Sequence, residues 1–189
     1  MLEAFFISFG VIFVAELGDK SQLMALAFAT RYKPWPVLAG ISIATAATHL
    51  ISVAIGGVVG ASLPTKQIGI AAAIAFVVFG IWTLRGDQLS EGDERRVAQS
   101  TRNVLVAVTT VFFLAELGDK TMLATVTLAT REGIFGTWLG STLGMIVADA
   151  LAIVVGRAMG KRLPEKTIRI GAAVSFFIFA VVLFVDAIR

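Results

Sequence analysis

The chain contains no cysteine and little charge. Without cysteine, no disulfide, thiolate metal site or cysteine redox couple can form. Only 15% of the 189 residues are Asp, Glu, Lys or Arg, whereas 57% are hydrophobic, and the mean hydropathy is +0.88. A soluble domain of this length needs far more polar surface, so the composition excludes a soluble globular protein.

Charged residues are absent from three long stretches, residues 34–65, 67–84 and 170–185. Apolar runs of this kind are typical of membrane-spanning helices, which need about 20 residues. We therefore predict an all-α integral membrane protein with six transmembrane helices, of which the first and fourth are long enough to tilt, kink or break. The predicted helices lie near residues 3–31, 36–60, 67–85, 103–131, 134–158 and 168–187.

The second half of the chain repeats the first at an offset of 100 residues. The sequence AELGDK occurs at residues 15–20 and again at residues 115–120. Glycines and prolines match in the same register, which chance similarity between apolar helices does not explain; examples are Gly40 with Gly140, Gly56 with Gly156, and Pro64 with Pro164. The sequence indicates a duplication, with residues 1–85 as the first repeat, 86–102 as a polar linker, and 103–189 as the second repeat.

Each repeat contains three predicted helices, which is an odd number. The second repeat must then enter the membrane from the opposite side, giving two inverted-topology three-helix repeats. This arrangement recurs in secondary transporters, where the substrate lies near the midplane between the repeats.

The basic residues are distributed unequally between the two sides of this topology. One side receives eleven of them: Arg31, Lys33, Arg85, Arg95, Arg96, Arg102, Arg157, Lys161, Arg162, Lys166 and Arg169. The other side receives Lys66, Arg131 and Arg189. Because cytoplasmic loops carry the excess of basic residues, we predict a cytoplasmic linker and both termini outside. The basic residues lie mostly in short loops, so membrane orientation accounts for the net charge of +3 and binding to nucleic acid is not needed to explain it. The N-terminus is expected to start the first span.

The repeated sequence places charge inside apolar segments, where charged side chains are costly and usually functional. We call ELGDKS at residues 16–21 the first motif and ELGDKT at residues 116–121 the second motif. In a continuous helix, Glu16, Asp19 and Lys20 would share one face, as would their counterparts. The residues of both motifs that carry this hypothesis are Glu16, Gly18, Asp19, Lys20, Ser21, Glu116, Gly118, Asp119, Lys120 and Thr121.

Two such faces in contact would form a site made entirely of oxygen ligands. Carboxylates, hydroxyls and the backbone carbonyls that local unwinding at Gly18 and Gly118 would expose suit a hard divalent cation such as Mn²⁺, Ca²⁺ or Mg²⁺. Four carboxylates and two lysines leave a charge of −2, which one divalent cation or two protons would neutralise. Competition between metal and protons for the same oxygens is the physical basis of cation/proton exchange.

Two other interpretations stay open for the charged positions. Glu16 and Lys20 could form an ion pair that only fixes packing, although Asp19 would then be unexplained. His49 and Asp149 occupy equivalent positions in the two repeats and are expected either to tune the site or to relay protons. A solitary histidine is more often a hydrogen-bonded core residue, whereas a carboxylate inside the membrane is harder to dismiss.

The two motifs resemble the Golgi-type calcium/manganese–proton exchanger family, whose bacterial branch is associated with manganese export. The resemblance covers the whole chain and implies that Glu16, Asp19, Glu116 and Asp119 bind the metal. We therefore expect a secondary transporter of the inner (plasma) membrane, and no enzyme, that exports Mn²⁺ in exchange for protons. It needs no permanently bound cofactor, because the metal ion is its substrate and H⁺ its counter-ion.

Other functions remain compatible with the sequence. Within transport, the alternative is a Ca²⁺/H⁺ exchanger, since family members differ between the two metals. Outside transport, the alternatives are an intramembrane acidic enzyme or a structural membrane subunit. Two nearly identical motifs favour a symmetric ion site over an acid/base pair with distinct pKa values. The expected partners are the lipid bilayer and a divalent metal ion, and the sequence leaves a homo-oligomer open.

Overall fold

The computed structural model describes residues 1–85, 103–159 and 165–188, and every regular element within these ranges is an α-helix. The predicted linker, residues 86–102, lies outside the described part of the chain. The helices are α1 (Leu2–Glu16), α2 (Lys20–Arg31), α3 (Pro34–Ser62), α4 (Thr65–Arg85), α6 (Val104–Glu116), α7 (Lys120–Glu132), α8 (Ile134–Met159) and α9 (Glu165–Ile188). The prediction of an all-helical protein is confirmed.

The predicted helices 3–31 and 103–131, which are long enough to kink or break, are each divided in two, so the described residues form eight helices where six were predicted. Between α1 and α2, Gly18 has a φ of 76°, and between α6 and α7, Gly118 has a φ of 77°. Residues with a side chain rarely adopt this left-handed conformation, whereas glycine adopts it readily. The helix therefore ends two residues before each glycine, at Glu16 or Glu116, and restarts directly after an aspartate in extended conformation, Asp19 or Asp119.

Four of the described helices are long and apolar enough to cross a membrane. The qualifying segments are Pro34–Ser62, Thr65–Arg85, Ile134–Arg157 and Arg169–Ile188. Each half of a divided helix is shorter, at 12 to 15 residues, than the roughly 20 residues that a span requires.

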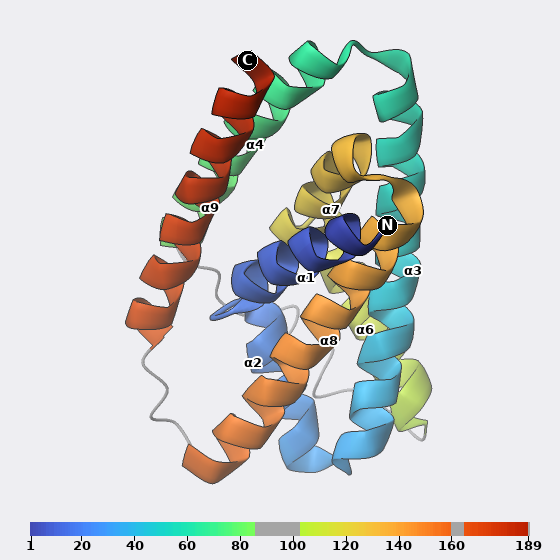
Figure 1. Ribbon diagram of the computed structural model, residues 1–189. Coiled ribbons are helices and arrows are strands. Elements are labelled where there is room, and N and C mark those ends of the chain that lie inside the picture. The colour runs from blue at the N-terminus through green and yellow to red at the C-terminus, as the bar shows by residue number, and fades with distance from the viewer. Residues whose placement is uncertain (86–102, 160–164, 189) are drawn as a thin grey trace.

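The two halves of the chain exchange their packing partners. Helix α1 of the first half packs along α8 of the second, and its counterpart α6 packs along α3 of the first half. Helices α4 and α9, which are also counterparts, lie side by side at one edge of the bundle (Figure 1). The divided helices are thereby enclosed by helices from the opposite half.

Glycines on the long helices permit this close contact. A Cβ atom added at Gly140 of α8 would lie 2.3 Å from the Phe5 carbonyl oxygen of α1. A Cβ atom added at Gly56 of α3 would lie 2.4 Å from the Val126 carbonyl oxygen of α7. Since real Cβ atoms do not approach so closely, small residues at these positions let the helix backbones meet, as is common between membrane helices.

Apolar side chains fill the interior and also cover the outer surface of the long helices. One core cluster includes Phe28 and Phe112, and a second includes Phe76 and Phe176. Large apolar residues are exposed along the outer faces, among them Leu50, Ile74, Val154, Ile178 and Val181. So many exposed large apolar side chains are unusual for a soluble monomer and suit contact with lipid.

Candidate functional site

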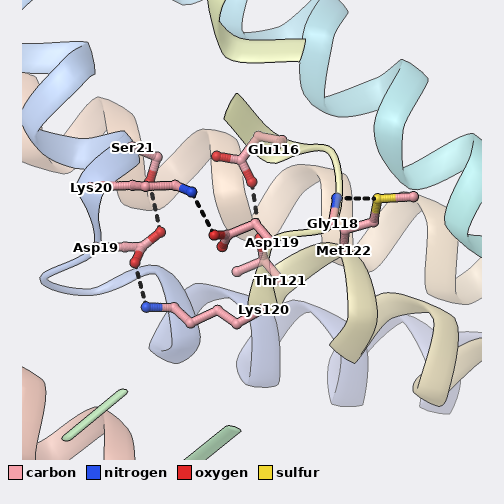
Figure 2. A network of polar contacts seen from close by, with 9 residues as sticks. All are labelled: Asp19, Lys20, Ser21, Glu116, Gly118, Asp119, Lys120, Thr121 and Met122. Atoms are coloured by element: carbon pink, nitrogen blue, oxygen red, sulfur yellow. Dashed lines mark hydrogen bonds and ion pairs between the residues drawn. The ribbon is translucent and has the colours of Figure 1, made fainter. Parts of the chain in front are cut away.

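The two helix breaks meet inside the molecule, and ion pairs cross between them. The Nζ atom of Lys20 lies 2.7 Å from Oδ1 of Asp119, and Lys120 pairs with Oδ1 of Asp19 (Figure 2). Each lysine thus contacts the aspartate of the opposite motif. The expectation that Glu16, Asp19 and Lys20 share one helical face was wrong, because the break separates Glu16 on α1 from Lys20 on α2.

The site is shielded from the surroundings of the protein. Among the four motif carboxylates, exposure ranges from 0% to 3%. Lys120 is buried like its partner, whereas the side chain of Lys20 keeps 20% of its surface exposed. Buried charges are stable only when paired or hydrogen-bonded, so the crossed pairs explain how two aspartates can remain charged there.

Both glutamates have carboxylate oxygens that accept no hydrogen bond from the described residues. Thr121 donates a hydrogen bond of 3.0 Å to Oε2 of Glu116 (Figure 2). The remaining oxygen of Glu116, and both oxygens of Glu16, are buried without a hydrogen-bond partner in the described residues. The charges that act on Glu16 include those of Asp19 and Glu116, so the carboxylates of both motifs share one electrostatic environment.

The hydroxyl groups of Ser21 and Thr121, which follow the two lysines, donate hydrogen bonds to different carboxylates. Ser21 donates to Oδ2 of Asp19 over 3.4 Å, whereas its counterpart Thr121 contacts a glutamate. The two half-sites therefore use equivalent residues with different partners in this conformation.

Gln22 was missed by the sequence interpretation. Its Oε1 accepts a hydrogen bond of 2.8 Å from the backbone N–H of Gly18, and its Nε2 donates to the carbonyl oxygen of Ala148 over 3.0 Å. The side chain thus links the first break to α8. In the second repeat Met122 takes this place, and its sulfur accepts from the N–H of Gly118 at 3.2 Å. A polar residue directly after the motif in an apolar segment could have indicated this role.

The second pair of predicted residues lies on the long helices. Asp149 is fully buried on α8, and neither of its oxygens has a hydrogen-bond partner within the described ranges. Its charge acts on both Glu16 and Glu116, so it shares the electrostatic environment of the motif carboxylates. His49 on α3 is also buried, but its ring nitrogens have no partner among the described residues and it does not join the network of Figure 2.

The carboxylates are near one another but are not arranged as a formed metal site. Within residues 1–85, 103–159 and 165–188, no three side chains of His, Cys, Asp or Glu are positioned to hold one ion together. The lysine ammonium groups lie between them instead. Coordination of a metal by both motifs would therefore require these side chains to move.

Buried charges that face one another across broken helices in an apolar bundle are typical of multi-pass membrane transporters. The model of the divalent cation/proton antiporter family GDT1 matches residues 4–91 and 104–189. The chain belongs to this family and is a transporter, which confirms the resemblance inferred from the two motifs and the expectation that it is no enzyme.

Individual relatives agree with this assignment. The chain is 36% identical, over 92% of its length and 86% of the relative's, to a Vibrio cholerae protein named "Putative manganese exporter". It is 31% identical, over 96% of its length and 97% of the relative's, to a GDT1-like protein of Synechocystis sp.. No solved structure matches the chain.

Proposed function

We propose that this protein exports Mn²⁺ from the cytoplasm in exchange for protons, at one site formed by Glu16, Asp19, Glu116 and Asp119. The observation that carries the proposal is the crossed pairing of the two motifs, in which Lys20 contacts Asp119 and Lys120 contacts Asp19. A packing role for each motif by itself would not need these contacts between repeats. The paired motifs instead support a single site with ligands from both halves.

The chemistry of the site supports a hard cation that competes with protons. Its ligand atoms are carboxylate and hydroxyl oxygens, with Ser21 and Thr121 as auxiliary donors, which suit Mn²⁺ or Ca²⁺. Glu16 and Glu116 retain buried oxygens without a partner, and each such group favours either a proton or a metal ion. Binding of one then promotes release of the other, and this competition couples the two fluxes.

Contacts between equivalent residues support an inverted arrangement of the repeats. The rings of Phe76 and Phe176 lie 5.8 Å apart, and the reciprocal pairs Phe76–Phe179 and Phe79–Phe176 lie 6.1 and 6.0 Å apart. A two-fold axis produces this reciprocity, because residue i contacts j while j contacts i. We propose that α1–α2 and α6–α7 each form one interrupted crossing, which completes six crossings with α3, α4, α8 and α9.

Basic residues that the sequence assigns to the outer side lie together at one end of the bundle, which supports the proposed topology. Arg131 at the end of α7 pairs with Asp186 near the end of α9, and both line a pocket with Lys66 at the start of α4. Lys66 and Arg131 are two of the three basic residues assigned to the outer side. We propose that this end of the bundle faces outward from the inner (plasma) membrane and that the linker is cytoplasmic.

We propose manganese and not calcium as the substrate because the relative from Vibrio cholerae is named for manganese export. The ligand chemistry itself accommodates both ions, so a Ca²⁺/H⁺ exchanger is the second candidate. Asp149 is proposed to add a further carboxylate or a proton relay beside Glu16 and Glu116, and His49 to have the lesser influence.

The experiment is a transport panel with purified protein in liposomes. Mn²⁺, Ca²⁺, Mg²⁺ and Zn²⁺ are offered separately under an imposed pH gradient, and metal and proton movements are recorded together. Mn²⁺ flux that dissipates the pH gradient is the expected result. Preferential Ca²⁺ flux would select the second candidate, and metal flux without proton movement would contradict exchange.

A further inference from the structure

The crossed pairs place lysine ammonium groups on the aspartate oxygens that a transported cation would need. Lys20 Nζ is 2.7 Å from Oδ1 of Asp119, and Lys120 is bound to Oδ1 of Asp19. Hard divalent cations approach carboxylate oxygens to about 2.0–2.6 Å. Oδ2 of Asp119 has no hydrogen-bond partner among the described residues, but a divalent cation bound there would lie close to the ammonium group on Oδ1 and would be repelled by it.

We propose that Lys20 and Lys120 are tethered counter-ions that alternate with the transported metal ion on Asp119 and Asp19. The inference rests on the proposed function, because it requires a divalent cation to enter the site. It assigns the lysines a positioning role in transport beyond fixing the packing of the motifs.

Burial makes a resident counter-ion necessary. Asp19 and Asp119 are 0% and 3% exposed, and an isolated carboxylate in such surroundings is strongly unfavourable. A permanently charged side chain from the opposite motif compensates each aspartate without any ion from solution. The charges of the two aspartates are thus balanced by residues of the chain itself through the part of the cycle in which no metal is bound.

A counter-ion role for the lysines predicts that two transport modes at the same metal site respond differently when a lysine charge is removed. Export in exchange for protons requires the carrier to return without metal, and that form depends on the lysines. Exchange of internal for external Mn²⁺ keeps metal in the site on both crossings, so the metal-free carrier does not have to reorient across the membrane. Removal of a lysine charge should therefore impair the first mode and spare the second.

The test compares Lys20→Met, Lys120→Met and wild-type protein in liposomes in both modes. Proton-coupled Mn²⁺ flux should fall by at least about tenfold, since a buried ion pair has lost one partner, while Mn²⁺ self-exchange stays near the wild-type rate. Lys20→Arg and Lys120→Arg retain the charge and should preserve most of the coupled flux. Lys66→Met, at an exposed position outside both motifs, is the matched control.

A parallel loss of both modes, or no loss of either, would overturn the tethered counter-ion. If wild-type protein moves no metal in either mode, the proposed function itself fails, so the two failures are distinguishable.

A second measurement uses the wild-type protein and does not depend on the folding of variants. An amine-reactive reagent followed by peptide mass spectrometry reports the accessibility of Lys20 and Lys120. Saturating Mn²⁺ should increase the labelling of both lysines relative to Lys66, because the metal opens the crossed pairs. Unchanged or reduced labelling would contradict displacement.

Discussion

At the scale of single residues, the two motifs differ from a set of independent ion pairs because each lysine has its aspartate partner in the other half. Lys20 and Asp119 are 99 positions apart in the chain and 2.7 Å apart in space. The sequence predicted which residues would gather, since charge in an apolar segment is rarely without function. It did not predict the crossed pairing, because the pair Glu16–Lys20 is favoured locally and only the tertiary structure brings the opposite aspartate closer.

The glutamates should be as important as the aspartates for transport. Glu16→Gln and Glu116→Gln each remove one anionic ligand from a buried oxygen cluster while keeping the side-chain shape. We expect Mn²⁺ flux to fall by at least about tenfold, with unchanged membrane insertion. Cell survival in excess Mn²⁺ and liposome flux measure the effect. Glu3→Gln, on the exposed start of α1, is the control; a loss there of equal size would remove the evidence for a specific site.

Asp149 and His49 are equivalent by position but should differ in effect. The charge of Asp149 acts on Glu16 and Glu116, so Asp149→Asn should reduce transport clearly. His49→Ala should be milder, because the histidine is buried without a link to the motif network. The rates of the two variants in the same liposome assay decide the order. A more severe defect in His49→Ala would indicate that the histidine, and not the aspartate, serves the site.

At the scale of helices, apolar run length predicted where the long elements lie but not where they break. The expected helices 36–60 and 134–158 correspond to α3 and α8 with ends that differ by no more than two residues. Ion pairs with the opposite repeat lie at the breaks near Gly18 and Gly118, and a local pattern does not contain these contacts. Glycine permits either close helix approach or unwinding, and the structure has unwinding at both positions.

The contact between α1 and α8 gives a prediction about stability. Gly140→Ala would place a Cβ atom 2.3 Å from the Phe5 carbonyl oxygen, and the helices would have to separate. Overpacking of this kind costs about 1–3 kcal/mol, so the melting temperature in detergent should fall. Gly171→Ala is the matched control, because its Cβ atom would meet nothing within 4 Å and alanine favours a helix. Equal destabilisation by both substitutions would exclude the close approach as the cause.

At the scale of the whole molecule, the exchange of packing partners joins the two halves of the chain into one bundle. Helix α1 packs on α8 and α6 packs on α3, so neither half encloses its own divided helix. The sequence predicts a duplication, because matching glycines, prolines and charges recur at a constant offset, and an odd number of crossings in each repeat stays a prediction. The interlocking of the halves required the structure.

The orientation of the molecule is also testable. Reporter fusions after Arg189 should be active on the outer side, and fusions within residues 86–102 should be active in the cytoplasm. The expected result follows from the eleven-to-three distribution of basic residues. A cytoplasmic C-terminus would contradict the proposed orientation.

The most direct measurement of the shared site is coupled flux in Asp19→Asn and Asp119→Asn. Each substitution lowers the negative charge of the site by one and leaves a lysine of the opposite motif without its anionic partner. Liposomes that report Mn²⁺ and internal pH together should show loss of both the metal flux and the coupled proton flux in each variant. The exposed Asp186→Asn variant should retain both. Near-normal Mn²⁺ flux in the two motif variants would contradict a site formed by both repeats.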